Sequence, residues 1–433
     1  MGVETLERGK LDYKFYLNGA IEYLLGQVKE NGYISASKDY DYYKPHWMRD
    51  SSFVALALLN AASCDMLDSL KRKEALEAAD KIISFDIRVI ERYMVNIRYA
   101  LSLKLEDYDF YTLKAHIPAR VGENGEYFKG VIDGRQIDDS VNLGIKNAGL
   151  IQNDSIPLVL LAIAKKAELF GLESNEMSFL NENLETLLMY MGKTYITPSG
   201  SIWEIYSEYM HAYDAAAIYA AFSAARRLAR RGIGKLSEER ISEIENGSYK
   251  GGPLGFVKDF FISNGILYDT RMPFSDAPLT SLGVDSSTIF IFNKFGISGE
   301  MLGNGKIEKD TIREIEEKLF AGNTLPVRFL SDTYFKGGRW LLLGLEFSRY
   351  YSAHGKLDKG KEIIDYILEK YGNSYPEQEI VNPATGIDGE GYLKRNGNNP
   401  IQNLAWSYAS VIDAIIEFYR ASKGQDEFIS AKR

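Results

Sequence analysis

Two glutamates stand where a carboxylate could carry out acid–base chemistry, and the first of them is Glu204. It follows a turn signal at residues 198–200 and a tryptophan, Trp203, and it precedes an alanine-rich run that predicts a helix over residues 209–231. A carboxyl group beside a large apolar ring can be held protonated near neutral pH and then act as a general acid. The alternative is an ordinary glutamate in the first turn of a helix, where the helix dipole favours a negative charge. Taken alone, the residue favours this second interpretation.

Glu377 is the second glutamate, in the run Pro376-Glu377-Gln378, and it would complete a catalytic pair. Cleavage of a glycosidic bond needs one carboxylic acid to protonate the leaving oxygen and one carboxylate to activate a water on the opposite face. Glu208 and Glu379 are rivals for these two roles, because each lies close to one of the candidates. The spacing of the residues leaves that choice open.

The tryptophans also gather around the predicted loops. An indole face is a good platform for a sugar ring, although any single tryptophan is equally well explained as part of a core. The side chains of Arg49, Asp50 and Arg328 offer the hydrogen bonds that sugar hydroxyls need. The chain contains four tryptophans, each in or beside a predicted loop: Trp47, Trp203, Trp340 and Trp406. Their joint placement favours a carbohydrate-binding cleft.

Composition excludes several other functions. The net charge of −9 argues against nucleic acid as a partner, since phosphate binding requires a basic surface. No apolar run is long enough to cross a membrane, no secretory signal is visible, and the single Cys64 allows no intrachain disulfide. The four histidines lack metal-ligand spacing, and no glycine-rich phosphate loop is present. We therefore expect a cytoplasmic protein with no metal ion and no cofactor; the sequence does not indicate an oligomeric state.

Helical periodicity dominates the chain. Short and long links alternate between the predicted helices, as in helical hairpins whose long loops all emerge at one end. Six such hairpins closed in a ring give an all-α (α/α)6 toroid with the long loops lining one face. No linker is visible, so residues 1–433 are predicted to form a single domain, and the glycine-rich residues 251–255 are predicted to be a loop. The predicted helices cover residues 6–29, 51–62, 71–101, 155–170, 176–191, 209–231, 237–245, 286–295, 309–320, 338–351, 359–371 and 404–419.

Five blocks of residues carry a family resemblance. In chain order they are Trp47-Met48-Arg49-Asp50; Gln152-Asn153-Asp154; Ile202-Trp203-Glu204; Arg328, Asp332 and Tyr334 with Gly337-Gly338-Arg339-Trp340; and Pro376-Glu377-Gln378 with Trp406-Ser407-Tyr408-Ala409. The sequence resembles the glucoamylase family, glycoside hydrolase family 15, in the order of these blocks. They span nearly the whole chain and are highly specific in combination.

The resemblance implies an (α/α)6 barrel and an inverting, exo-acting α-glucosidase that removes glucose from non-reducing ends as the β-anomer. By position, it implies that Glu204 is the general acid and Glu377 the general base. Arg328 and Tyr334 would then lie near the scissile bond. The substrate-binding residues that it implies, with Trp203 as a further platform, are Tyr43, Trp47, Arg49, Asp50, Arg328, Tyr334, Trp340 and Trp406.

The sequence departs from the fungal members at two positions. Ile205 stands where they have a second carboxylate, and near Ala148 they have a tryptophan that this chain lacks. We expect short malto- or isomalto-oligosaccharides as substrates, because neither a β-sandwich nor a starch-binding module fits within the chain. Two alternatives stay open: hydrolysis of α,α-trehalose by the same carboxylates, and a regulatory module that binds glucan without cleaving it.

Overall fold

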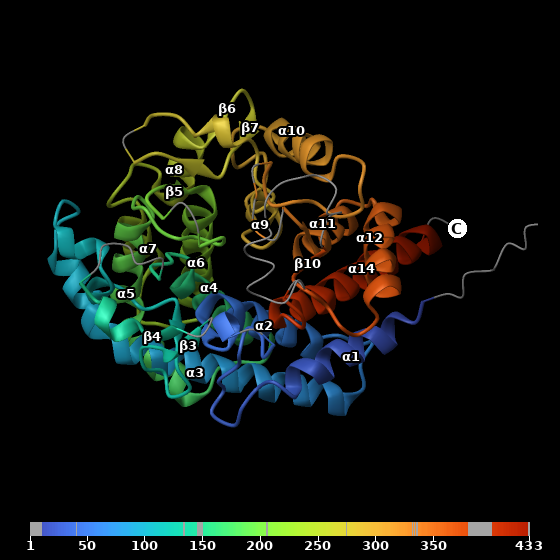
Figure 1. Cartoon of the computed structure of the whole chain (residues 1–433), viewed down its shortest axis with the longest axis horizontal. Coiled ribbons are helices and arrows are strands. Elements are labelled where there is room, and N and C mark those ends of the chain that lie inside the picture. Colours follow the sequence, from blue (N-terminus) through green and yellow to red (C-terminus); the bar gives the residue numbers. More distant parts are fainter. Residues whose placement is uncertain are drawn as a thin grey trace, which may run out of the picture.

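The helices of this protein are arranged in a ring (Figure 1). In that view the chain passes from the blue helices through green and yellow to the red C-terminal helix, which lies beside the first helix. α1 and α14 are accordingly in contact. The computed structural model describes residues 11–39, 41–132, 135–144, 150–204, 207–273, 275–330, 332, 334, 337–379 and 401–431.

Six helices among the described residues form the inner ring. α2 contacts α4, α4 contacts α6, α6 contacts α9, α9 contacts α11, α11 contacts α14, and α14 closes the circle on α2. The inner helices are α2 (Met48–Ala62), α4 (Ser155–Leu169), α6 (Ala212–Arg230), α9 (Thr288–Asn293), α11 (Leu341–Ala353) and α14 (Ala405–Ala431). The outer helices are α1 (Tyr13–Leu25), α3 (Ser69–Ser102), α5 (Ser174–Thr194), α7 (Glu238–Glu245), α8 (Gly252–Phe260), α10 (Gly305–Ile315) and α12 (Leu357–Tyr371). The predicted (α/α)6 toroid is therefore confirmed.

Residue composition explains which helices lie inside. Nearly every residue of α2 is buried, and α6 buries a series of alanines, whose small side chains let neighbouring helices approach closely. A helix that is apolar on all sides must be covered on all sides. The core is further tied by Phe53 of α2, whose ring stacks on Trp406 of α14 at 4.3 Å between centroids. This stacking joins the first and last inner helices, which are neighbours in the ring.

Short antiparallel strand pairs fix the long loops to the inner helices. β1 ends one residue before α2 and pairs with β2, with Trp47 opposite Arg120. In the same way β5 precedes α6 and pairs with β8, and β9 precedes α11 and pairs with β10. The strands are β1 (His46–Trp47), β2 (Arg120–Val121), β3 (Lys129–Ile132), β4 (Arg135–Asp138), β5 (Met210–His211), β6 (Ile262–Ser263), β7 (Ile266–Leu267), β8 (Thr270–Arg271), β9 (Arg339–Trp340) and β10 (Gln378–Glu379).

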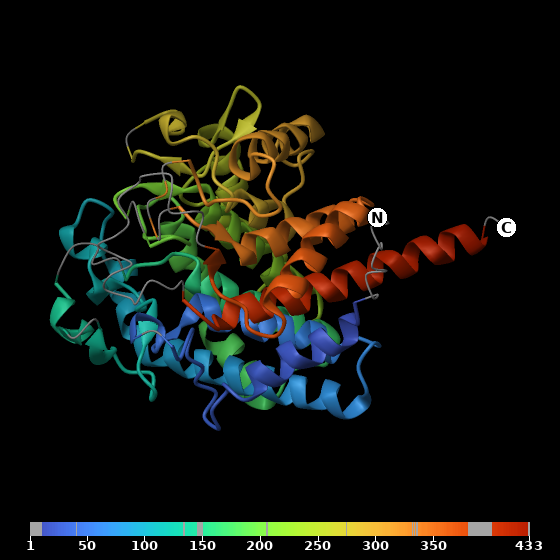
Figure 2. The ribbon, with the colours of Figure 1, turned by 45° about the vertical axis from the view of Figure 1, so that its right-hand side comes forward.

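Two helical predictions need correction. The glycine-rich stretch is not all loop, because α8 begins within it at Gly252. Gly251 and Gly252 adopt positive φ angles of 89° and 62°, and the following Pro253 occupies the first turn, where its missing N–H has no cost. α14 also runs beyond its predicted end to Ala431 and extends past the other helices (Figure 2). None of the described helices combines the length and apolarity that a membrane crossing requires.

Candidate active site

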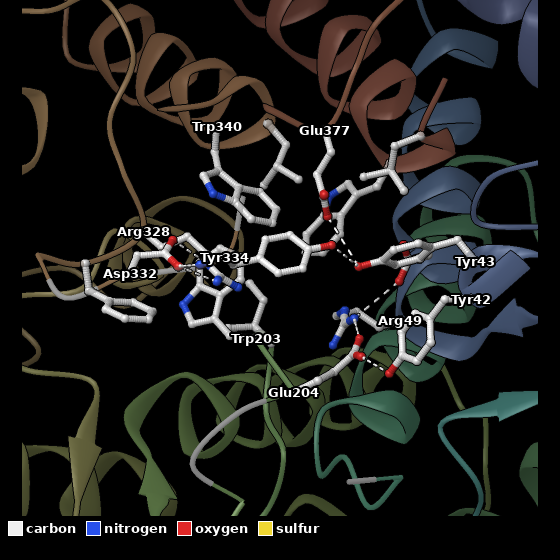
Figure 3. Close-up of a pocket in the computed structure, with 16 residues that line it drawn as sticks. Tyr42, Tyr43, Arg49, Trp203, Glu204, Arg328, Asp332, Tyr334, Trp340 and Glu377 are labelled. Atoms are coloured by element: carbon white, nitrogen blue, oxygen red, sulfur yellow. Dashed lines mark hydrogen bonds and ion pairs between the residues drawn. The ribbon is translucent and has the colours of Figure 1, made fainter. Parts of the chain in front are cut away.

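A cavity of about 520 Å³ opens at the ends of the inner helices where their long preceding loops meet (Figure 3). Arg49 and Asp50 come from the first turn of α2, and Trp406 comes from the first turn of α14. The cavity is of a size typical of small-molecule sites. It is lined by Tyr42, Tyr43, Arg49, Asp50, Ile202, Trp203, Glu204, Arg328, Phe329, Asp332, Tyr334, Trp340, Leu342, Glu377, Leu404 and Trp406.

All the predicted site residues except Trp47 line this cavity. Trp47 is buried, with 1% of its surface exposed, and lies behind the cavity wall. Its ring packs against those of Tyr42 and Tyr43, at centroid distances of 5.5 and 6.3 Å. Trp47 thus supports the two tyrosines that face the cavity, and its contact with substrate stays a prediction.

Glu204 lies in a turn of the loop before α6 and not at the helix entrance. α6 begins only at Ala212, and the acidic residue in its first turn is Asp214. Glu204 has a φ angle of 58°, a left-handed conformation that is uncommon for a residue with a side chain. The interpretation as a first-turn glutamate is thus wrong. Its rival Glu208 is exposed and does not line the cavity.

The Glu204 carboxylate is held by two donors. Arg49 donates from Nη2 to Oε1 at 2.9 Å, and the Tyr42 hydroxyl donates to Oε2 at 2.9 Å. The side chain is 14% exposed, so these charge-assisted contacts are made in a largely desolvated place. The Glu204 carboxylate therefore contacts a guanidinium and a phenol, and not the apolar surroundings that the neighbouring Trp203 led us to expect.

Glu377 enters the cavity from the side opposite Glu204 (Figure 3). The Tyr43 hydroxyl donates to its Oε1 at 3.4 Å, and the backbone N–H of Glu377 donates to the carbonyl of Ile401 at 2.8 Å. Burial raises the pKa of Glu377 to about 8; Arg328 opposes this shift and Glu204 adds to it. At neutral pH the empty site therefore keeps a proton on Glu377.

The rival of Glu377 has a structural role. Glu379 does not line the cavity, and its Oε1 accepts hydrogen bonds from Tyr366 at 2.8 Å, Lys370 at 2.8 Å and Tyr371 at 2.7 Å. These partners belong to α12, so Glu379 fastens strand β10 to the outer helix. Glu377 comes just before β10 and lines the cavity, whereas Glu379 within the strand is anchored outside it.

Arg49 and Asp50 form a buried polar floor. Arg49 donates to the side chain of Gln152 and to the carbonyl of Ser201, each at 3.1 Å. Burial raises the pKa of Asp50 to about 6, although Arg49, 3.5 Å away, lowers it. Asp50 Oδ2 has no hydrogen-bond partner among the described residues. A ligand hydroxyl at the floor would supply one.

Arg328 lies inside a cage of aromatic rings. Its guanidinium forms a two-pronged ion pair with Asp332, both bonds being 2.7 Å. It also lies 4.8 Å from the ring centroid of Trp340 and 5.2 Å from that of Trp203. These contacts fix the orientation of both indoles. The indole N–H groups of Trp340 and Trp406 have no partner in the described part of the chain.

Three residues that support the site were missed as functional candidates. Tyr42 was overlooked although it stands next to Tyr43, because nothing in the sequence shows that both adjacent tyrosines line the cavity. Asp285 accepts from the Trp203 indole at 3.0 and 3.1 Å, and Asp332 pairs with Arg328. Asp332 stands in one of the family blocks, whereas Asp285 lies in none and gave no signal.

Chemically, the cavity places two carboxyl groups on facing sides of a space lined by indoles, phenols and a buried guanidinium. This arrangement suits acid–base cleavage of a bond held between the two carboxyls. Among the described residues, no group of histidine, cysteine and carboxylate side chains could hold a metal ion. Ile205 and Ala148, the two positions that depart from fungal glucoamylases, lie outside the described residues.

Solved structures share the fold of this chain. A glycosidase solved in complex with glucose matches with a TM-score of 0.72 and 16% identity, covering 95% of this chain and 99% of that chain. The glucoamylase from Saccharomycopsis fibuligera matches with a TM-score of 0.55 and 14% identity, covering 98% of each chain. The family 15 glucoamylase from Hypocrea jecorina matches with a TM-score of 0.59 and 16% identity, covering 94% of this chain and 72% of that chain. No curated protein sequence matches.

The family comparison covers most of the chain. The model of the family described as Glycosyl hydrolases family 15 matches residues 12–319. The matched range contains the Arg49 and Glu204 blocks and ends before Arg328 and Glu377, which the fold brings to the same cavity. The chain belongs to glycosyl hydrolase family 15, and it is a glycoside hydrolase with the (α/α)6 fold.

Proposed function

We propose that this glycoside hydrolase is an inverting, exo-acting α-glucosidase that removes glucose from the non-reducing ends of short malto- or isomalto-oligosaccharides. The observation that carries the proposal is the pair Glu204 and Glu377, which face one another across an aromatic cavity (Figure 3). Exo-action is supported by the buried floor of Arg49 and Asp50, which closes the cavity beyond a terminal sugar. The single-domain organisation and the cytoplasmic location stay predictions from the sequence.

The two carboxyls have different tasks. Glu204 gives its proton to the glycosidic oxygen as the bond to the anomeric carbon breaks, and its carboxylate is then stabilised by Arg49. Glu377 takes a proton from a water that attacks the same carbon from the opposite face, so the configuration inverts. Arg49 and Asp50 bind hydroxyls of the terminal glucose, while Tyr43, Arg328, Tyr334 and the tryptophans Trp203, Trp340 and Trp406 surround its ring.

The productive enzyme carries one proton on this pair of carboxyls. In the empty site at neutral pH the proton is on Glu377, whose pKa is about 8. Catalysis requires the proton on Glu204 instead. Both arrangements hold one proton and have the same total charge.

This proton count predicts the alkaline side of the pH profile. Above a pH of about 8 the pair loses its one proton, so kcat/KM on maltose should fall about tenfold per pH unit while it stays nearly level through neutrality. Initial rates at low maltose concentration, measured across neutral and alkaline pH, test this. A decline that begins well below neutral pH would contradict the proposed protonation of Glu377.

The proposed function is tested by a substrate panel combined with the stereochemistry of the product. Glucose release is measured on maltose, isomaltose, dextrin and α,α-trehalose, and proton NMR records the first anomer formed from the preferred substrate. We expect β-glucose from maltose or isomaltose. α-Glucose as the first product would overturn inversion, and turnover of trehalose alone would replace the proposed substrate class.

A further inference from the structure

Tyr42 stands directly against the proposed proton donor. Its hydroxyl donates to Glu204 Oε2 at 2.9 Å, while Arg49 takes the other carboxylate oxygen. The two donors approach the carboxylate from different elements, since Tyr42 lies in the loop before α2 and Arg49 in the helix itself. Glu204 is thus held at both oxygens, although its own backbone lies in a turn.

A buried chain of contacts fixes Tyr42 in turn. The Arg120 guanidinium lies 5.2 Å from the centroid of the Tyr42 ring and 5.5 Å from that of Trp47. Arg120 is itself clamped by Asp139, with bonds of 2.9 and 3.0 Å, and its backbone is paired with Trp47 in the β1–β2 ladder. The Tyr42 ring is therefore held in place by its contacts with Trp47 and with the buried Arg120 guanidinium.

A phenol that donates to the Glu204 carboxylate favours the step in which Glu204 gives up its proton. When a general acid gives up its proton it becomes a carboxylate, and a hydrogen bond to that carboxylate strengthens as the negative charge develops. The cation against the face of the Tyr42 ring draws electron density from the phenol and makes its O–H a better donor. Tyr42 thus favours proton transfer to the leaving oxygen, beyond its effect on the position of Glu204.

We propose that Tyr42, held by Arg120 and Asp139, is the positioning residue of the general acid and promotes departure of the leaving group by stabilising the Glu204 carboxylate. This inference rests on the proposed function, because it requires Glu204 to be the acid. It assigns a task in the reaction to a residue outside the family blocks. It also explains why a second aromatic residue precedes Tyr43 at the cavity wall.

The test compares Tyr42→Phe with the wild type on substrates whose leaving groups need different amounts of protonation. Phenylalanine keeps the ring against Arg120 and removes only the hydroxyl. A hydrogen bond to a charged group is worth enough to lower kcat on maltose by about tenfold to a hundredfold. The rate on α-glucosyl fluoride should be unchanged, because fluoride leaves without a proton.

Tyr33→Phe is the matched control. The Tyr33 hydroxyl donates to the carbonyl of Lys44 at 2.6 Å and so anchors the same loop without facing the cavity. This variant should lower thermal stability and leave the ratio of the maltose and fluoride rates as in the wild type. An equal fall of both rates in Tyr42→Phe, or no fall, would overturn the inference.

Glu204→Gln separates failure of the inference from failure of the proposed function. If Glu204→Gln loses activity on maltose while Tyr42→Phe keeps the wild-type rate, Tyr42 has no part in acid catalysis and the proposed function stands. If Glu204→Gln is fully active, the acid has been wrongly assigned, and the task given to Tyr42 falls with it.

Discussion

Glu204→Gln is expected to lower kcat on maltose by about 10²–10⁴-fold, the usual contribution of a general acid, with little change in KM. Glutamine keeps the shape of the side chain and retains an oxygen that can accept from Arg49 or Tyr42. It has no proton to give to the leaving sugar. Activity on α-glucosyl fluoride should fall far less, since this leaving group departs as an anion. Steady-state kinetics on the two substrates measure the difference.

Glu208→Gln is the control for this experiment. Glu208 lies four residues along the same loop, is exposed and does not line the cavity, so its variant should match the wild type on both substrates. Equal losses on maltose and fluoride in Glu204→Gln would mean that the side chain holds the sugar and does not donate a proton. Near-normal activity on maltose would remove Glu204 from the mechanism.

The sequence could predict which segments meet at the site, because the order of helices and loops determines this. Alternation of short and long links places every long loop at one end of a helical ring, and residues as distant as Arg49, Glu204 and Glu377 must then meet there. This reasoning needs only the approximate positions of helices, which periodicity supplies. It does not depend on where any single side chain points.

The direction of each side chain could not be predicted from the sequence. Trp47 belongs to a family block, yet it is buried outside the cavity lining, with its ring centroid 5.5 Å from the Arg120 guanidinium. Tyr42, in the short turn of residues 41–43 before β1, lines the cavity, and a turn of three residues followed by a strand of two leaves no periodic pattern that predicts this difference. The surroundings of Glu204 were mistaken for a similar reason. Its neighbour in sequence is an indole, but its neighbours in space are a guanidinium and a phenol from another segment.

Glu377→Gln is expected to lower kcat by about 10²–10⁴-fold on maltose and by a comparable factor on α-glucosyl fluoride. Both reactions need an activated water, whatever the leaving group, so a better leaving group does not restore the rate. The variant also loses the group whose pKa is about 8. Any residual activity should therefore no longer decline with a midpoint near pH 8. The same two-substrate assay, repeated across pH, measures both effects.

Glu379→Gln is the matched control for the base. Its carboxylate is bound by Tyr366, Lys370 and Tyr371 outside the cavity, so the substitution should lower the melting temperature while the folded enzyme keeps its kcat. The contrast between substrates then assigns the roles. A loss confined to maltose identifies an acid, whereas a loss shared with the fluoride identifies a base. If Glu377→Gln kept its activity on the fluoride and Glu204→Gln did not, the acid and base assignments would have to be exchanged. The proton on Glu377 in the empty site would then be the one given to the leaving group.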